Sequence, residues 1–223
     1  MIRRHKPKRK SDKNIYFGVK VMVIGLTGQT GAGKSTVARL AAEMSCCVVD
    51  CDAVAREALS PGSDCLKRLA ELFGCDIINE DGSCRRRLLA SRAFADKEKT
   101  ALLNSITHPW IIQRSSEYIE QYRQKSDAPI IFDAPLLYES GGDALCDCVI
   151  AVIAPLDVRL DRIMKRDGIT REEAMLRINA QQDDEFYISR ADHIIDGSEP
   201  LAQVRKKLIK LLEEIKRKNK NEV

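Results

Sequence analysis

GLTGQTGAGKST, residues 25–36, contains four glycines and one lysine and directly follows the apolar run of residues 21–24. Each glycine costs backbone entropy on folding, so a turn this rich in glycine indicates a need for backbone freedom. After the turn, residues 35–44 (STVARLAAEM) carry apolar side chains at helical spacing. The stretch therefore predicts a buried strand, a tight turn and a helix.

The turn also matches a phosphate-binding pattern, because Gly28 to Ser35 fit G-x-x-x-x-G-K-[ST] at every fixed position. In such a loop, backbone N–H groups surround anionic oxygens and the following helix presents its positive dipole end to them. The lysine neutralises the β- and γ-phosphates, and the serine hydroxyl ligates Mg²⁺. We therefore expect a bound nucleoside triphosphate. Its predicted ligands are Gly31, Ala32, Gly33, Lys34, Ser35 and Thr36.

Short apolar runs recur along the chain and alternate with helical patterns. Uninterrupted apolarity suits strands that are buried on both faces, and the intervening helices suit parallel crossovers. We expect an α/β fold with a doubly wound parallel sheet of about five strands, as in P-loop NTPases. The predicted strands are residues 21–26, 46–49, 130–132, 149–153 and 193–195.

Residues 53–128 are more chain than one crossover needs. Helical spacing occurs there in four stretches, which are interrupted by SPGS, EDGS and THP. We expect this part to be a helical insertion that binds the substrate beside a nucleotide-binding core, within a single domain of residues 20–223. The four predicted helices are residues 65–73, 86–95, 98–106 and 110–123.

Residues 155–190 predict two charged helices that join at Asp167-Gly168, with Thr170 and Glu173 forming a capping box. Their arginines would suit a lid that closes over a transferring phosphate and excludes water, although a solvated charged face is the alternative. The arginines are Arg159, Arg162, Arg166, Arg171 and Arg177. Further on, residues 201–215 carry an apolar stripe that predicts a helix packed on the sheet.

Charge separates the start of the chain from its body. Residues 1–13 carry seven basic side chains and one acidic one, whereas the remaining 30 basic and 32 acidic residues leave the body at −2. Residues 1–19 therefore predict a disordered basic tail that could contact polyanions weakly, and we expect no specific nucleic-acid partner. The sequence shows no secretory signal, membrane span or disulfide framework, so a cytoplasmic location is expected.

Two groups of carboxylates follow predicted strands. In VVDCDAVAR, residues 48–56, alternation along the strand end would place Asp50 and Asp52 on one side, where one could accept a proton and the other orient Mg²⁺. A pair of helix caps is the alternative. Asp133 ends the next strand like the Mg²⁺-binding aspartate of a Walker B element, or it starts a turn before Pro135.

Together these motifs resemble the dephospho-coenzyme A kinase family from about residue 23 to residue 200. The resemblance rests on the order and spacing of the glycine-rich loop and five short motifs. These are VDCDAVAR (49–56), ITHPWI (106–111), PLLYE (135–139), RDGITREEAMLRINAQ (166–181) and ADHIID (191–196).

The resemblance implies transfer of a phosphoryl group from ATP to the ribose 3′-hydroxyl of dephospho-CoA, which gives CoA and ADP in the last step of CoA synthesis. It implies that Asp52 is the general base. It also implies that Arg56, Arg86 and His108 contact the acceptor and that Arg166, with Arg162 on the same helix face, binds ATP phosphates. Arg85 and Asp196 depart from the family pattern, so their effect on acceptor and adenine contacts stays open.

Other readings compete with this one. A GTPase would carry DxxG and NKxD elements, which we do not find here. A kinase of another small molecule and a P-loop module that uses ATP as a switch remain alternatives. Oligomeric state and the preference for ATP over GTP are also left open.

Overall fold

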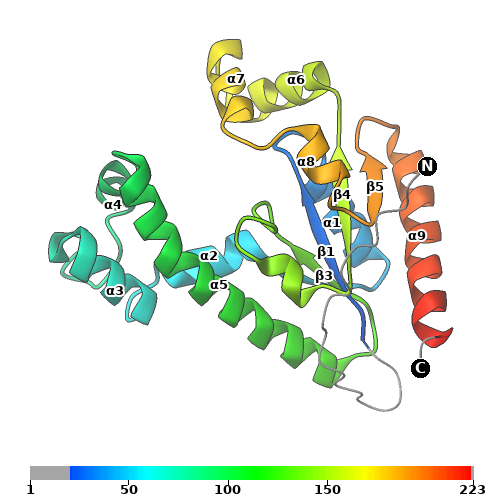
Figure 1. Ribbon diagram of the computed structural model, residues 1–223, viewed down its shortest axis with the longest axis horizontal. Coiled ribbons are helices and arrows are strands. Elements are labelled where there is room, and N and C mark those ends of the chain that lie inside the picture. The colour runs from blue at the N-terminus through cyan, green and yellow to red at the C-terminus, as the bar shows by residue number, and fades with distance from the viewer. Residues whose placement is uncertain (1–20, 222–223) are drawn as a thin grey trace. The chain divides into compact units, whose positions relative to one another are not determined.

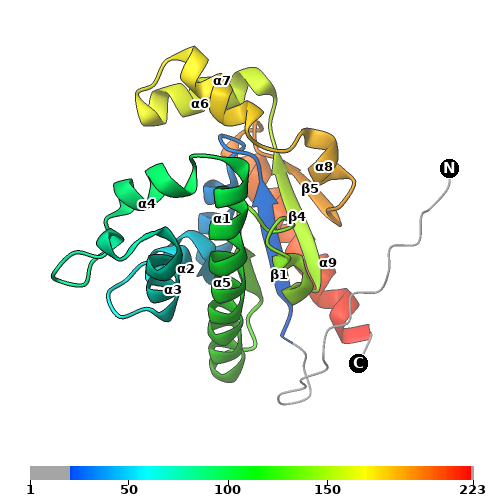
Figure 2. The same cartoon turned by 60° about the vertical axis from the view of Figure 1, so that its left-hand side comes forward.

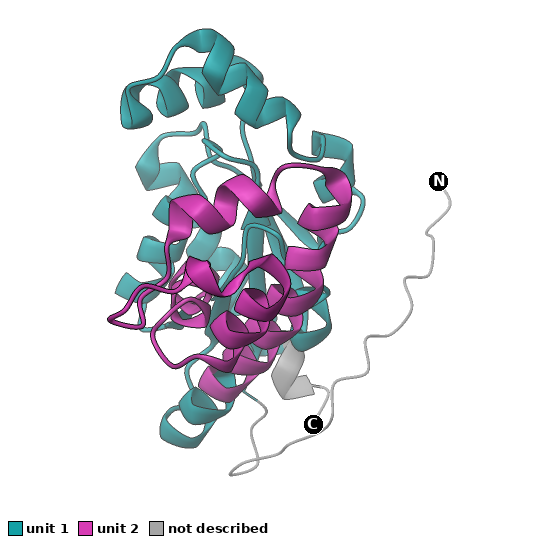
Figure 3. Cartoon of the chain, turned by 90° about the vertical axis from the view of Figure 1, so that its left-hand side faces the viewer, with its two compact units in different colours: residues 1–49, 119–223 teal, residues 50–118 magenta. Residues whose placement is uncertain are grey.

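The computed structural model describes residues 21–221, so the predicted basic tail lies outside the described residues (Figure 1). The chain divides into two compact units (Figure 3). Unit 1 contains residues 21–49 and 119–221 of the described chain, and unit 2 contains residues 50–118.

Unit 1 is built around a five-stranded sheet with the order β2-β3-β1-β4-β5. The pairings of β1 with β3, of β1 with β4 and of β4 with β5 are parallel. The structure confirms the predicted fold class, and each strand lies within two residues of its predicted run. The strands are β1 (Val23–Gly28), β2 (Cys47–Asp50), β3 (Ile130–Asp133), β4 (Cys148–Ile153) and β5 (His193–Asp196).

Strand β1 occupies the centre of this sheet, and all six of its residues are buried. Leu26 of β1 lies beside Asp133 of β3 on one side and beside Ile150 of β4 on the other. In open α/β sheets, ligands bind at the carboxyl ends of the strands where the strand order reverses. The glycine-rich turn after β1 is therefore at the position where this fold binds ligands.

Two helices cover one face of the sheet and share its largest apolar core (Figures 1 and 2). These helices are α1 and α9. Val37 and Leu40 of α1 belong to the same core as Val204 and Leu208 of α9 and Ile150 of β4. The predicted apolar stripe is thus buried along most of its length. The helical elements of unit 1 are α1 (Lys34–Glu43), η2 (Gly142–Leu145), α6 (Leu156–Asp167), α7 (Arg171–Asn179), α8 (Asp184–Ile188) and α9 (Leu201–Asn221).

Helices α6 and α7 pack on each other with a small apolar core of their own, formed by Leu160, Ile163, Ala174 and Ile178. The predicted capping box is present: Glu173 N–H donates to Thr170 Oγ1 over 3.2 Å, and Thr170 N–H donates to Glu173 Oε2 over 2.9 Å. This reciprocal pair satisfies two N–H groups at the start of α7.

Unit 2 is helical and has a separate core, which includes Leu66, Leu69, Phe73, Ile77 and Leu89. Its elements are α2 (Cys51–Ala58), α3 (Asp64–Phe73), η1 (Cys75–Ile77), α4 (Arg86–Ala93) and α5 (Lys97–Lys125), the last of which continues into unit 1.

The predicted break at THP is wrong, because α5 runs through Pro109 without interruption. Proline removes one helical hydrogen bond, which normally ends or bends a helix. Here Ile106 and Trp110, on either side of the proline, pack against the unit 2 core. The Thr107 hydroxyl also donates to the Leu103 carbonyl over 3.0 Å. Packing of the flanking side chains therefore outweighs the lost hydrogen bond.

Within residues 21–221, the structure contains no helix with the length and apolarity needed to cross a membrane.

Replacement of Leu208 by Ala should lower the free energy of unfolding by about 2–5 kcal/mol, because Leu208 is fully buried between α9 and the sheet. Leu201 begins the same helix but is 50% exposed, so Leu201→Ala should cost less than about 1 kcal/mol. Urea unfolding of both variants measures the difference. Equal losses would contradict the packing of α9 described above.

Candidate active site

The glycine-rich loop leads into α1 with an N-terminus that no side chain caps. Gly33 is the N-cap residue, with φ 104° and ψ 15°, a left-handed conformation that favours glycine. The first turn of α1 contains no acidic residue. The positive end of this helix is therefore available to an external anion such as a phosphate.

Lys34 and Asp133 meet beside this helix start. The Lys34 ammonium donates a hydrogen bond to Asp133 Oδ1, and both side chains are largely buried. Asp133 is the last residue of β3, so it belongs to the strand end and not to a turn. The structure thus places two predicted site residues, the lysine and the Walker B-like aspartate, in direct contact.

Ser35 and Asp133, the residues predicted to hold Mg²⁺, suit a metal ion whose other ligands are phosphate oxygens and water. Ser35 is exposed in the first turn of α1 and Asp133 lies against Lys34. The described residues contain no cluster of three or more His, Cys, Asp or Glu side chains that could hold a metal. Mg²⁺ in kinases commonly takes one or two protein ligands and completes its coordination with phosphates and water, which agrees with this arrangement.

Arg162 of α6 binds the loop itself. It donates from Nη1 to the carbonyls of Gly31 and Ala32 over 3.1 and 3.3 Å, and from Nη2 to the carbonyl of Gly197 over 2.8 Å. The arginine thereby joins the loop to the turn after β5. Sequence reasoning named Arg162 for the nucleotide but gave no signal for Gly197.

The segment that follows α7 also contacts the loop. Thr30 N–H donates to Gln181 Oε1 over 2.8 Å, and Gln29 Nε2 donates to the Gln182 carbonyl over 2.9 Å. These glutamines were not among the predicted site residues, because a glutamine after a helix has no distinctive pattern of its own.

Arg166, the other predicted nucleotide-binding arginine of α6, is paired within its own region. It donates from Nε and Nη2 to the two oxygens of Asp167 over 2.7 and 2.9 Å. Arg177 donates to the same carboxylate over 2.5 Å. The hydrogen bond from Arg166 lowers the pKa of Asp167 below its ordinary value. The Arg166 side chain is 60% exposed, so water can compete for its hydrogen bonds with Asp167.

In unit 2, the two aspartates of the DxD motif occupy different structural positions. Asp50 ends β2 and caps α2, accepting at Oδ1 from the N–H groups of Asp52 and Ala53 over 2.9 and 3.2 Å. Asp52 lies in the first turn of α2, so the prediction of one strand carrying both residues is wrong. Among the described residues, no hydrogen bond or ion pair involves the exposed Asp52 carboxylate. Asp50 alone is therefore the cap.

The three predicted acceptor contacts are dispersed over unit 2. Arg56 is exposed on α2, 4.0 Å from Asp50 Oδ2, and Arg86 is exposed at the start of α4. His108 is partly buried on α5, and burial lowers its pKa, which favours the neutral imidazole. No contact between these three side chains is formed.

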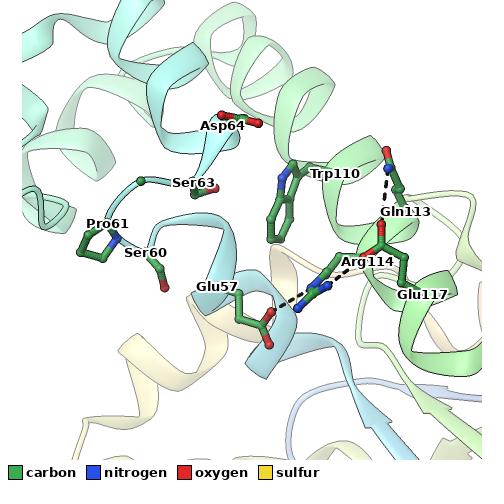
Figure 4. A pocket seen from close by; sticks show the side chains of 10 residues that line it. Glu57, Ser60, Pro61, Ser63, Asp64, Trp110, Gln113, Arg114 and Glu117 are labelled. Carbon is green, nitrogen blue, oxygen red and sulfur yellow. Dashed lines mark hydrogen bonds and ion pairs between the residues drawn. The ribbon is translucent and has the colours of Figure 1, made fainter. Parts of the chain in front are cut away.

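Unit 2 also contains a pocket of about 700 Å³ (Figure 4). Arg114 is its cationic side chain, and it donates to Glu57 over 3.1 Å and to Glu117 over 2.8 Å. The Tyr118 hydroxyl donates to the other Glu57 oxygen over 2.8 Å. The pocket is lined by Glu57, Ser60, Pro61, Gly62, Ser63, Asp64, Trp110, Gln113, Arg114 and Glu117, so none of the three predicted acceptor contacts lines it.

The two departures from the expected motifs have local partners. Arg85 donates from Nε to Asn79 Oδ1 over 2.5 Å within unit 2. Asp196 accepts from the N–H and hydroxyl of Ser198 over 2.8 and 2.5 Å, and these hydrogen bonds lower its pKa. Both residues thus have hydrogen-bond partners within a few residues of the chain: Arg85 at the start of α4 and Asp196 at the end of β5.

Solved structures share this architecture. The Thermus thermophilus protein TT1252 superposes with a TM-score of 0.71 at 32% identity, over 87% of this chain and 97% of that one. A dephospho-CoA kinase from Campylobacter jejuni superposes with a TM-score of 0.66 at 27% identity, over 88% and 98% of the two chains. A shikimate kinase from Bacteroides thetaiotaomicron, at 16% identity and a TM-score of 0.52, shares the fold.

Sequence relatives agree with the structural ones. The dephospho-CoA kinase of Corynebacterium diphtheriae is 44% identical over 79% of this chain and 88% of its own length. That of Bacillus licheniformis is 38% identical over 86% and 96% of the two lengths. The family model for dephospho-CoA kinase matches residues 22–203. The chain therefore belongs to the dephospho-CoA kinase family, the ATP-dependent phosphotransferases of the last step of coenzyme A synthesis.

Proposed function

We propose that this chain transfers the γ-phosphoryl group of ATP to the ribose 3′-hydroxyl of dephospho-CoA. The Asp52 carboxylate takes the hydroxyl proton as the new O–P bond forms. The bond between the γ-phosphorus and the β,γ-bridging oxygen breaks, and ADP leaves with that oxygen. The observation that carries the proposal is the uncapped start of α1 with Lys34 beside it, a built site for a nucleotide phosphate.

The separate positions of Asp50 and Asp52 support Asp52 as the base. A carboxylate that caps a helix accepts hydrogen bonds from N–H groups and is held at the helix start. Asp50 is in that position, whereas Asp52 is exposed and has no side-chain partner among the described residues. Of the two, Asp52 is therefore free to accept a proton from an acceptor hydroxyl.

The phosphates would be bound by the backbone of Gly31, Ala32 and Gly33 and by Lys34, Ser35 and Thr36. Ser35 would ligate Mg²⁺ directly and Asp133 would hold it through water. When bound, Mg²⁺ neutralises charge that develops on the phosphate oxygens. Asp133 also keeps the Lys34 ammonium at the start of α1, where a β- or γ-phosphate would meet it.

We further propose that residues 155–190 act as the lid and that Arg166 exchanges Asp167 for ATP phosphates when the lid closes. The small core between α6 and α7 supports movement of these helices as one body. Solvent exposure of the Arg166–Asp167 pair supports the exchange, because exposed ion pairs contribute little net free energy.

For the acceptor, we propose unit 2, with contacts from Arg56, Arg86 and His108. The two arginines are exposed and would suit the diphosphate of dephospho-CoA. The pocket of Figure 4 has different chemistry, because its arginine is already paired with two glutamates. It would suit an uncharged, hydrogen-bonding part of the acceptor. We expect the reaction to take place in the cytoplasm.

Replacement of Asp52 by Asn should lower kcat by about 10²–10⁴-fold, because Asn cannot accept the hydroxyl proton. ADP release should depend on dephospho-CoA in the unmodified protein, and mass spectrometry should identify CoA as the product. The measurement is a coupled assay of ADP release with Mg-ATP.

Asp50→Asn is the matched comparison, because Asn caps a helix about as well as Asp does. This variant should lose less than about tenfold in kcat. A larger loss in Asp50→Asn than in Asp52→Asn would contradict the assignment of the base. ADP release that ignores dephospho-CoA would contradict the proposed function itself.

Chelation of Mg²⁺ with excess EDTA should abolish ADP release, and added Mg²⁺ should restore it. Ser35→Ala should raise the Mg²⁺ concentration for half-maximal activity by at least about tenfold, since it removes a hydroxyl ligand. Ser91→Ala, which removes an exposed serine hydroxyl of α4, should leave this concentration unchanged. Identical Mg²⁺ titrations for the two variants would argue against Ser35 as a ligand.

A further inference from the structure

Arg159 lies against the phosphate-binding loop at a point where only glycine fits. It belongs to the first turns of α6, and Gly31, with φ +78°, is directly opposite its backbone. A Cβ at residue 31 would be 2.8 Å from the Arg159 carbonyl oxygen and 3.0 Å from its Cα. The absence of a side chain at Gly31 therefore lets the main chain of Arg159 pack directly on the loop.

Two of the three guanidinium nitrogens of Arg159 are buried without a hydrogen-bond partner in the part of the chain that the structure describes. The residue is 5% exposed, and its Nε and Nη1 are buried with no hydrogen-bond acceptor among the described residues. An arginine side chain stays protonated in proteins, so it cannot escape this situation by losing its charge. A buried cation without an anion or hydrogen bonds is strongly unfavourable. Among the described residues no carboxylate forms an ion pair with this guanidinium, so an external anion would satisfy it.

The other cations predicted to bind nucleotide phosphates have protein partners. Lys34 binds Asp133, Arg162 binds backbone carbonyls, and Arg166 binds Asp167. Arg159 differs from them even though Arg162 lies only three residues further along the same helix. The lack of hydrogen-bond partners is thus a property of the Arg159 side chain and not of all the arginines on α6.

The Arg159 guanidinium acts electrostatically on Tyr187. The pKa of Tyr187 is raised to about 12, first by burial and then by the Glu139 carboxylate, while the Arg159 guanidinium opposes the rise. Glu139 follows β3 in the PLLYE stretch, and Tyr187 lies in α8. The guanidinium therefore shares an electrostatic environment with groups that follow β3, the strand that ends in Asp133.

We propose that Arg159 is a phosphate-binding residue. Its guanidinium donates hydrogen bonds to anionic oxygens of the nucleotide that the glycine-rich loop holds. Guanidinium groups bind phosphate oxygens in a planar, two-pronged geometry that lysine cannot reproduce. The main chain of Arg159 packs on Gly31 of this loop. The inference rests on the nucleotide-binding part of the proposed function and does not require dephospho-CoA as the acceptor.

The test combines nucleotide affinity with ligand-free stability. Arg159→Met removes the charge and keeps an unbranched side chain. The Kd for Mg-ADP or a non-hydrolysable Mg-ATP analogue, measured by calorimetry, should rise about 10- to 100-fold, as expected for loss of hydrogen bonds to a charged group. Without nucleotide, the urea midpoint should stay the same or rise, because a buried, unpaired charge has been removed. Arg159→Lys should give an intermediate Kd.

Arg217→Met is the matched control, since it removes the same charge from an exposed position on α9; it should change neither the Kd nor the urea midpoint. A structural role for Arg159 predicts the opposite pattern: a lower urea midpoint for Arg159→Met and a Kd within twofold of the unmodified protein. That result would overturn the proposal. An increase confined to the KM for dephospho-CoA, with unchanged nucleotide Kd, would overturn it as well.

These binding measurements separate this inference from the proposed function. An unmodified protein that binds nucleotide but leaves dephospho-CoA unphosphorylated would refute the proposed reaction, while the comparison of Arg159 with Arg217 would still decide the inference. An unmodified protein that binds no nucleotide would overturn both.

Discussion

The accumulation of positive charge around one turn of the backbone is the constraint on which the rest of this site depends. The N-terminus of α1, Lys34, Arg159 and Arg162 all lie at or against residues 28–34. In the absence of a polyphosphate these charges repel one another, and burial increases their cost. Three of these four groups avoid this cost. Lys34 pairs with Asp133, Arg162 donates to backbone carbonyls, and no side chain caps the start of α1. Nucleotide binding can then replace these partners with phosphate oxygens.

Four of the aspartates discussed above differ in their partners, and their backbone positions decide which partner each has. Asp133 ends a central strand and holds Lys34, Asp50 ends an edge strand and caps the next helix, and Asp167 ends α6 and holds two arginines. Asp52 is the exception, since its carboxylate is exposed and without a described partner. This difference, and not the chemistry of the side chain, supports it as the proton acceptor.

Stability and function use different parts of the chain. The core beneath the sheet depends on α1 and α9, and unit 2 has its own core around Leu69 and Phe73. Most residues proposed to bind phosphates lie in the turn after β1, in the first turn of α1 or on α6, where rigid elements position them. Variants of the proposed catalytic residues can therefore be studied in a folded protein, with the core variants as independent controls of stability.

The sequence by itself determined the local elements and their chemistry. Strand positions, the glycine-rich loop and the capping box of Thr170 and Glu173 follow from patterns within a few residues, so they could be predicted without neighbours in space. The uninterrupted α5 could not be predicted, because Pro109 is tolerated only through packing of Ile106 and Trp110 on a distant core. The division of work between Asp50 and Asp52 depended on where β2 stops, a boundary that spacing alone left open. Only the tertiary structure distinguished Arg159 from Arg162 and Arg166, because burial and the presence of a partner are set by segments far apart in the chain.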